Sequence, residues 1–141
     1  MDRQPALVNA YAQDGFQPLG LAAFFGNQAA VDYLLDRGAQ VNSPSQNAMR
    51  VMPLHSAAAS GQLEIARSLL AHGANPNSVQ ADGFVPLHAA AQNGQIEMVE
   101  LLLSYGANLK IPTEDGKTAL DFALENRHTR VANLLQERGA P

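Results

Sequence analysis

The sequence has no cysteine and no tryptophan among its 141 residues. Without cysteine the chain has no disulfide bond, thiolate metal site or cysteine nucleophile. No run of about 18 apolar residues occurs, so the sequence predicts no membrane-spanning helix. The first residues, Met1 to Pro5, lack the basic segment followed by an apolar one that a secretory signal has. From these absences we expect a cytoplasmic protein that does not contact a membrane.

Positive charge is also scarce. Nine Lys and Arg stand against thirteen Asp and Glu, which gives a formal net charge of −4. A phosphate backbone needs a basic surface, so we expect no nucleic-acid partner. Hydrophobic residues make up 46% of the chain, which predicts a folded domain, and the length predicts a single one. Because aromatic residues reach only 6%, a contact surface would be built from Phe, Tyr and Met.

Leucine, glycine and proline recur at a nearly fixed interval. Leu19, Leu54, Leu87 and Leu120 are separated by 35, 33 and 33 residues, and a Gly-Ala pair follows each leucine at the same distance. Pro18, Pro53 and Pro86 precede their leucines and suit the first turn of a helix. Within each unit, an alanine-rich stretch ends at glycine, and a second stretch carries apolar pairs one helical turn apart. The pattern predicts an all-α chain with helices near 18–25, 28–37, 53–60, 63–72, 86–93, 96–105, 119–126 and 129–138.

The repeated block identifies a family resemblance. Pro53-Leu54-His55-Ser56-Ala57 and Pro86-Leu87-His88-Ala89-Ala90 resemble the ankyrin repeat, which has a period near 33 residues and the signature T-P-L-H-x-A. The resemblance covers nearly the whole chain. It implies an ankyrin-like solenoid, in which helix–turn–helix units stack side by side and protruding hairpin loops connect them. It also implies a protein-binding role for the concave face and the loop tips.

The resemblance divides the chain into a single array of units. We expect repeat 1 at 14–48 with a lengthened loop, repeat 2 at 49–81, repeat 3 at 82–114, and a polar, cap-like repeat 4 at 115–141. Residues 1–13 match the tail of an incomplete preceding repeat. The residues leave open whether the chain is an excerpt of a longer array or begins with a half-repeat that acts as a minimal cap.

Repeat 1 departs from the pattern more than the others. The threonine that caps the first helix in the family is retained only at Thr118; Gln17, Met52 and Val85 replace it elsewhere. Each lost cap costs about 1 kcal/mol. Gly20 stands where repeats 2 and 3 have histidine, and glycine inside a helix costs about 1 kcal/mol relative to alanine. We therefore expect the first helix of repeat 1 to be the weakest.

Catalytic chemistry is not indicated. His55 and His88 lie at the same position of neighbouring repeats, about one repeat apart, and no third or fourth metal ligand converges with them. The resemblance implies that this histidine orders the hairpin loop by bonding its backbone. His128 is expected to be solvated at an outer turn. The glycine spacing matches no phosphate-binding loop. We expect no catalytic residue, no cofactor and no metal.

We interpret the chain as a non-catalytic module that binds another protein. Positions three before and five or six after each repeat's leucine are expected on the concave face, and the loop at 43–50 is expected to be an exposed finger. The candidate partner-binding residues are Phe16, Phe24, Phe25, Met49, Val51, Phe84, Gln92 and Asn93. Phe24 and Phe25 are adjacent and cannot both point inward, so a partner or a second copy of the chain would dock at the repeat 1 end. The competing explanation is that they pack on residues 1–13 or on an upstream repeat.

Two other functions fit the same residues. The chain could be a regulatory or accessory segment of a larger enzyme, or an inhibitor that occludes a partner's site. An adjoining catalytic domain would distinguish the first of these, and a tight complex that blocks an enzyme's site would distinguish the second.

Overall fold

The computed structural model describes residues 8–139 of the chain. In this part, eight α-helices form four helix–turn–helix pairs, and the all-α prediction is confirmed. The helices are α2 (Pro18–Phe25), α3 (Gln28–Asp36), α4 (Pro53–Ala59), α5 (Leu63–Ala71), α6 (Pro86–Gln92), α7 (Ile96–Ser104), α8 (Ala119–Glu125) and α9 (Thr129–Glu137). Apart from α2, each helix ends one residue earlier than predicted, because the last residue expected in it is the C-cap.

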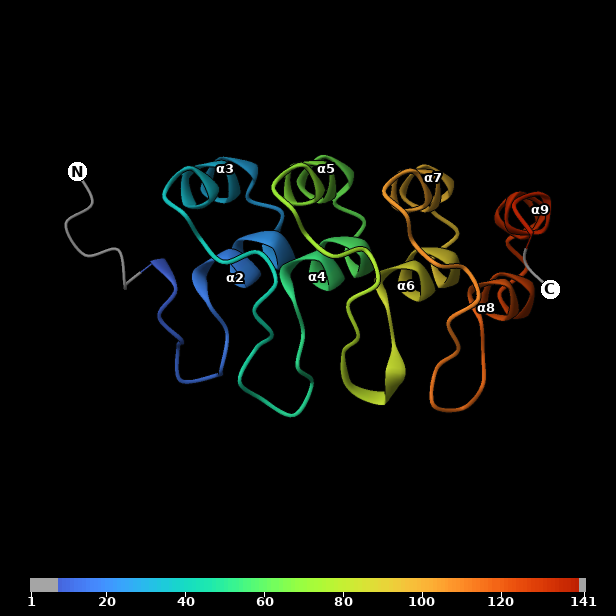
Figure 1. The fold of residues 1–141 in the computed structure, drawn as a ribbon, viewed down its shortest axis with the longest axis horizontal. Helices are drawn as coiled ribbons and strands as arrows, with labels where there is room; N and C mark the ends of the chain where they lie inside the picture. Colours follow the sequence, from blue (N-terminus) through green and yellow to red (C-terminus); the bar gives the residue numbers. More distant parts are fainter. Residues whose placement is uncertain (1–7, 140–141) are drawn as a thin grey trace.

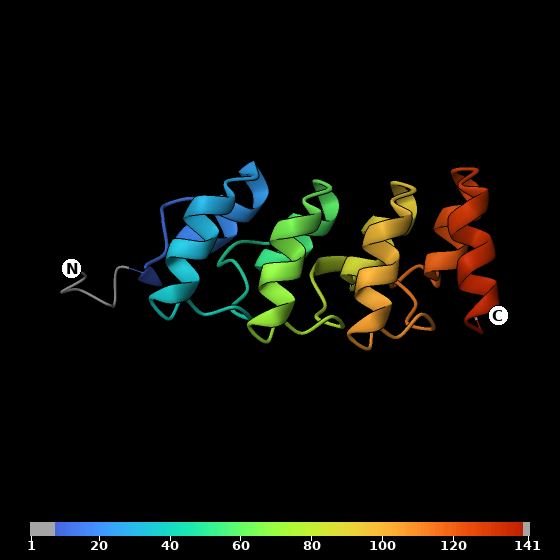
Figure 2. The same ribbon diagram turned by 90° about the horizontal axis from the view of Figure 1, so that it is seen from above.

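The pairs stack into an elongated array (Figure 1). Helices α2, α4, α6 and α8 form an inner row, in which each packs on the next, and α3, α5, α7 and α9 form an outer row. The hairpin-like loops, called fingers here, project from the inner row on the side away from the outer helices. Seen from above, the four pairs lie side by side along the long axis (Figure 2). One of the fingers contains a short 3₁₀ turn, Ala81–Gly83.

Leucine and alanine at matching positions form the core. The leucines that set the repeat, from Leu19 to Leu120, are at most 4% exposed, and Ala57, Ala58 and Ala90 are completely buried. Small side chains let the inner helices approach closely, and the aliphatic stripe of each outer helix closes the layer above them. Because each pair buries its apolar face only against its neighbours, the array is stabilised junction by junction.

Histidine ties two of the fingers to the inner row, as the resemblance implied. Nδ1 of His55 accepts a hydrogen bond from the Met52 backbone N–H at 3.0 Å, and its Nε2 lies 2.7 Å from the Ser78 carbonyl oxygen. His88 makes the equivalent bonds at 3.0 and 2.8 Å, to Val85 and to the next finger. The imidazole thus satisfies the backbone N–H at the start of a helix whose N-cap residue offers no bond of its own.

The turn between the helices of a pair needs glycine for two reasons. Gly26 has φ of +75°, and a Cβ there would lie 2.6 Å from the Gln62 side chain of the next pair. Gln95 covers Gly61, and His128 covers Gly94, in the same way. The expectation that His128 is solvated was therefore wrong: it is half-buried, and its Nε2 lies 3.0 Å from the Gln92 carbonyl oxygen.

An asparagine bridges neighbouring pairs beneath the outer helices. The Asn42 side chain donates to the Gly73 carbonyl oxygen at 3.0 Å and accepts from the Asn75 N–H at 2.8 Å. Asn77 makes the same two bonds to the third pair, at 3.1 and 2.7 Å. Oδ1 of Asn9 accepts from the Gln40 N–H at 2.8 Å, which repeats one of these bonds at the start of the array.

The long loop before α4 is less exposed than expected. Ser45 is buried, its hydroxyl accepts a hydrogen bond from the Val51 N–H at 2.8 Å, and its own N–H bonds the Val51 carbonyl oxygen at 2.8 Å. The adjacent Gln46 N–H bonds the Gly15 carbonyl oxygen at 2.7 Å. Gln80 and Thr113, at the same repeat position as Ser45, make the equivalent backbone bonds to Phe84 and Lys117, so the longer loop keeps the usual closure of a finger. Met49, 56% exposed, reaches solvent.

Candidate binding groove

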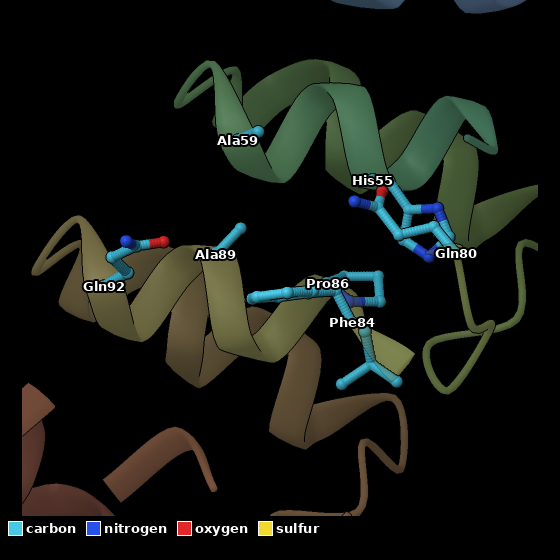
Figure 3. A pocket seen from close by; sticks show the side chains of 8 residues that line it. His55, Ala59, Gln80, Phe84, Pro86, Ala89 and Gln92 are labelled. Atoms are coloured by element: carbon cyan, nitrogen blue, oxygen red, sulfur yellow. The ribbon is translucent and has the colours of Figure 1, made fainter. Parts of the chain in front are cut away.

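Two hollows open along the inner row of helices. The first, of about 200 Å³, lies between α4 and α6 and is roofed by the finger between them. Figure 3 shows Ala59 and His55 from α4 facing Ala89 and Gln92 from α6. The side chains lining it are those of His55, Ala59, Gln80, Phe84, Val85, Pro86, Ala89 and Gln92. Alanine on both helices leaves this gap open, because a methyl group fills little of it.

The second hollow, of about 140 Å³, lies next to the first, between α2 and α4. Phe16 and Phe24 line it from the α2 side, and Met49 and Val51 line it from the long loop. Ser56 and three residues that also line the first hollow complete it. Because His55, Ala59 and Gln80 border both hollows, we treat the two as one surface and call it the groove.

The structure brings six of the eight candidate residues to the groove. Phe16, Phe24, Met49 and Val51 line one hollow, and Phe84 and Gln92 line the other. Phe25 lines neither: its ring meets that of Phe24 edge to face at 5.2 Å, and the residue is 74% exposed. Asn93 also lies outside, since its side chain donates to the Ala59 carbonyl oxygen at 3.1 Å.

Sequence reasoning missed several lining residues, of which Gln80 and Pro86 are the most informative. Gln80 belongs to a finger that is bonded to α4, because Nε2 of His55 lies 2.7 Å from the Ser78 carbonyl oxygen, two residues before Gln80. Ser45 and Thr113 hold the same repeat position, but because the residue type varies, the repeat does not indicate a role for Gln80. Pro86 was interpreted only as a helix-starting residue, although the same ring also forms a wall.

The groove does not continue across the last inner helix. Lys117 and Glu125 stand where the first pair has Phe16 and Phe24, and where the second has Val51 and Ala59. Their side chains form an ion pair at 3.1 Å, and the Lys117 ammonium lies 5.8 Å from the centre of the Phe122 ring. A polar bridge therefore occupies the place that is apolar over α2 and α4.

The groove carries no formal charge at neutral pH. No Asp, Glu, Lys or Arg lines either hollow. Burial lowers the pKa of His55 below its usual value of 6.5, although its bond to the Ser78 carbonyl oxygen opposes the shift. Burial likewise lowers the pKa of His88, against the effect of the Ile111 carbonyl oxygen. Both imidazoles are therefore neutral at pH 7.

Neither a metal site nor a membrane span was found in the described part of the chain. Among residues 8–139, no group of three or more His, Asp or Glu side chains is placed to hold a metal ion. The helices in the same range are too short and insufficiently apolar to cross a bilayer.

Comparison with protein families agrees with the fold and the repeated block. A family model for ankyrin repeats, built of three copies, matches residues 4–82 and again 54–141. The two matches together span nearly the whole sequence, so this chain belongs to the ankyrin repeat family. Ankyrin repeats are generally protein–protein interaction modules and are typically non-catalytic.

Proposed function

We propose that the chain is a non-catalytic module that binds one protein partner through the groove and the adjoining finger tips. The observation that carries this proposal is a cluster of exposed large apolar side chains at one end of the array: Phe24 is 54% exposed, Phe25 74% and Met49 56%. Burying one such side chain stabilises a complex by roughly 1.5–3 kcal/mol. Exposed apolar patches of this kind mark contact sites in soluble proteins.

The test is capture of the partner from a lysate of the source cells by the intact chain, followed by mass spectrometry. The variant Phe24→Ser with Phe25→Ser should lose the captured protein, and Gln92→Ala with Asn93→Ala should weaken it. Tyr105→Ser is the matched control, because Tyr105 is an exposed aromatic residue at the end of outer helix α7.

Circular dichroism must show that each variant keeps its helices. Capture that is unchanged in the phenylalanine variant would contradict the proposal, as would a variant that loses binding only because its first helix pair unfolds. A captured enzyme whose activity falls on binding would identify the chain as an occluding inhibitor.

A second candidate function is self-association through the outer side of the first helix pair. Three equivalent leucines of the later pairs, Leu69, Leu102 and Leu135, are completely buried, whereas Leu34 at the same position is only half-buried. Tyr33 of the same helix is 53% exposed, and Phe25 of the same pair is 74% exposed. Sedimentation of the wild type against Phe25→Ser tests this, because a monomer at high concentration in both would exclude self-association.

We also propose the division into units at 14–48, 49–81, 82–114 and 115–141, preceded by the tail of an incomplete repeat at 1–13. Residues 1–7 of that tail lie outside the described part. Two observations support it: Asn9 bonds the next unit as Asn42 does, and Val8 is buried in the core. Replacing Asn9 with alanine should lower the free energy of unfolding by about 1 kcal/mol. Equilibrium urea unfolding measures this, and no change would contradict the assignment.

A further inference from the structure

The size and extent of the groove restrict what it can hold. It spans three inner helices, α2, α4 and α6, and neighbouring helices pack about 8–10 Å apart, so it is on the order of 20 Å long. An extended chain advances about 3.3 Å per residue, so about six residues of extended peptide fit along it. The hollow beside Met49, of about 140 Å³, is suited to one large side chain.

The chemistry of the residues that line this hollow favours an uncharged ligand side chain as the group that fills it. Phe24, Met49 and Val51 surround the hollow, and no charged side chain is present to pair with an ionised group. An ionised side chain buried there would lose its hydration without compensation, which is strongly unfavourable. An aliphatic or aromatic side chain would instead gain the full benefit of burial.

Two carboxamides supply polar contacts along the same surface. Gln80 borders both hollows and Gln92 borders the first, and neither side chain makes a hydrogen bond within residues 8–139. A carboxamide has an acceptor oxygen and a donor nitrogen, which match the N–H and C=O of a peptide backbone. The groove therefore offers backbone-directed bonds next to an apolar floor of Ala59 and Ala89.

The ion pair of the last inner helix marks where this surface ends. Lys117 and Glu125 hold each other at 3.1 Å, so an apolar ligand would have to displace a polar bridge to continue past α6. The ligand's contacts accordingly end at Gln92, the last groove residue in chain order.

We propose that the partner contributes a flexible peptide segment, anchored by one large uncharged aliphatic or aromatic side chain in the hollow beside Met49. Its backbone bonds Gln80 and Gln92, and its contacts stop before α8. This inference rests on the proposed protein-binding function and specifies the class of ligand that the groove takes.

The experiment uses a displayed library of random peptides of about twelve residues, long enough to exceed the estimated length of the groove. The library is selected on the intact chain. Enriched sequences should share one large apolar residue with no acidic or basic residue at that position. The best peptide, labelled with a fluorophore, is then titrated against the wild type and three variants by anisotropy.

Ala59→Glu is the main variant, because Ala59 is exposed and borders both hollows. It places a charge in the middle of the groove and should weaken binding at least about tenfold. Ala71→Glu makes the same change at the exposed end of outer helix α5 and should leave the affinity within about twofold of the wild type. Glu125→Ala, which breaks the ion pair beyond the end of the groove, should also leave it unchanged.

The possible results separate this inference from the function on which it rests. Charged anchors among the selected peptides, or equal affinities of Ala59→Glu and Ala71→Glu, would overturn the inference. If no peptide is enriched while a folded partner is still captured in a Phe24-dependent manner, the peptide inference fails and the proposed function stands. If capture is independent of Phe24 as well, both fail. Should Ala59→Glu not fold, Met49→Glu at the exposed rim of the hollow replaces it.

Discussion

The two buried histidines, His55 and His88, should make the free energy of unfolding depend on pH. The Met52 N–H has to donate to Nδ1 of His55, and the Ser78 carbonyl oxygen has to accept from Nε2. These two partners leave only the neutral tautomer with its proton on Nε2, because a second proton on Nδ1 would face a donor 3.0 Å away. His88 has the same arrangement, and the rings of Phe84 and Phe122 pack against it.

The sign and size of the effect follow from this geometry. Burial lowers the pKa of both histidines in the folded chain below 6.5, so the unfolded chain binds more protons once the pH falls below that value. The stabilisation is complete above pH 6.5 and is lost as the pH falls towards the folded-state pKa. If a histidine stays neutral in the folded chain, the free energy of unfolding falls by about 1.4 kcal/mol at one pH unit below 6.5. The two histidines together lose at most about 2.8 kcal/mol, a large part of a typical stability of about 5–15 kcal/mol.

Urea unfolding followed by circular dichroism, at half-unit steps from pH 7.5 to 5.5, measures this loss. The variant His55→Gln with His88→Gln is compared with its own value at pH 7.5, so a general loss of stability does not affect the result. Its stability should change much less with pH than that of the wild type. His72→Gln, at an exposed C-cap, is the control and should keep the full dependence. Equal pH dependence in the wild type and the double variant would refute the reasoning.

Three further predictions concern the first half of the array. Gly20→Ala should raise the free energy of unfolding by about 1 kcal/mol, because glycine is unfavourable inside a helix. The new Cβ would lie 3.8 Å from Phe16 Cδ1, which is an ordinary contact. No gain in the free energy measured by urea unfolding would contradict this. Arg50→Gly should also stabilise the chain by about 1 kcal/mol, since Arg50 has φ of +51°, where a Cβ is strained. In hydrogen exchange followed by mass spectrometry, α2 should exchange faster than α7, because α2 contains Gly20 and lies at the end of the array. Equal protection of the two helices would exclude this local weakness.

The fold could be predicted from the sequence because its causes are local and repeated. The proline–leucine start of each inner helix, the glycine after it and the aliphatic stripe of the outer helix each act within one unit. Gln80 and Ser45 show where this reasoning ends. Gln80 joins the groove because its finger is bonded to α4 through Ser78 and His55, and Ser45 is buried where it closes its own finger onto Val51. The two residues share one position of the repeat, but their residue types differ, so the repeated pattern does not mark their roles.

Phe24 and Phe25 show the same limit within one helix. They are adjacent in sequence and equally apolar, so sequence alone assigned both to the concave face. The structure places Phe24 in the hollow beside Met49 and leaves Phe25 outside it. The difference follows from their angular positions at the end of α2, about 100° apart around the helix axis.

The junction between the third and fourth pairs is held by different polar contacts from the two junctions before it. Asn42 and Asn77 each bridge two pairs, but Lys110 occupies the corresponding position before α8, and a lysine side chain has no acceptor for a backbone N–H. The third junction relies instead on His128, which covers Gly94 and reaches the Gln92 carbonyl oxygen at 3.0 Å. Gln92 therefore has two separate roles, since its backbone holds the last pair while its side chain borders the groove. The side chains that bridge the pairs, Asn42, Asn77 and His128, do not line the groove, so a substitution of the Gln92 side chain leaves these bonds in place.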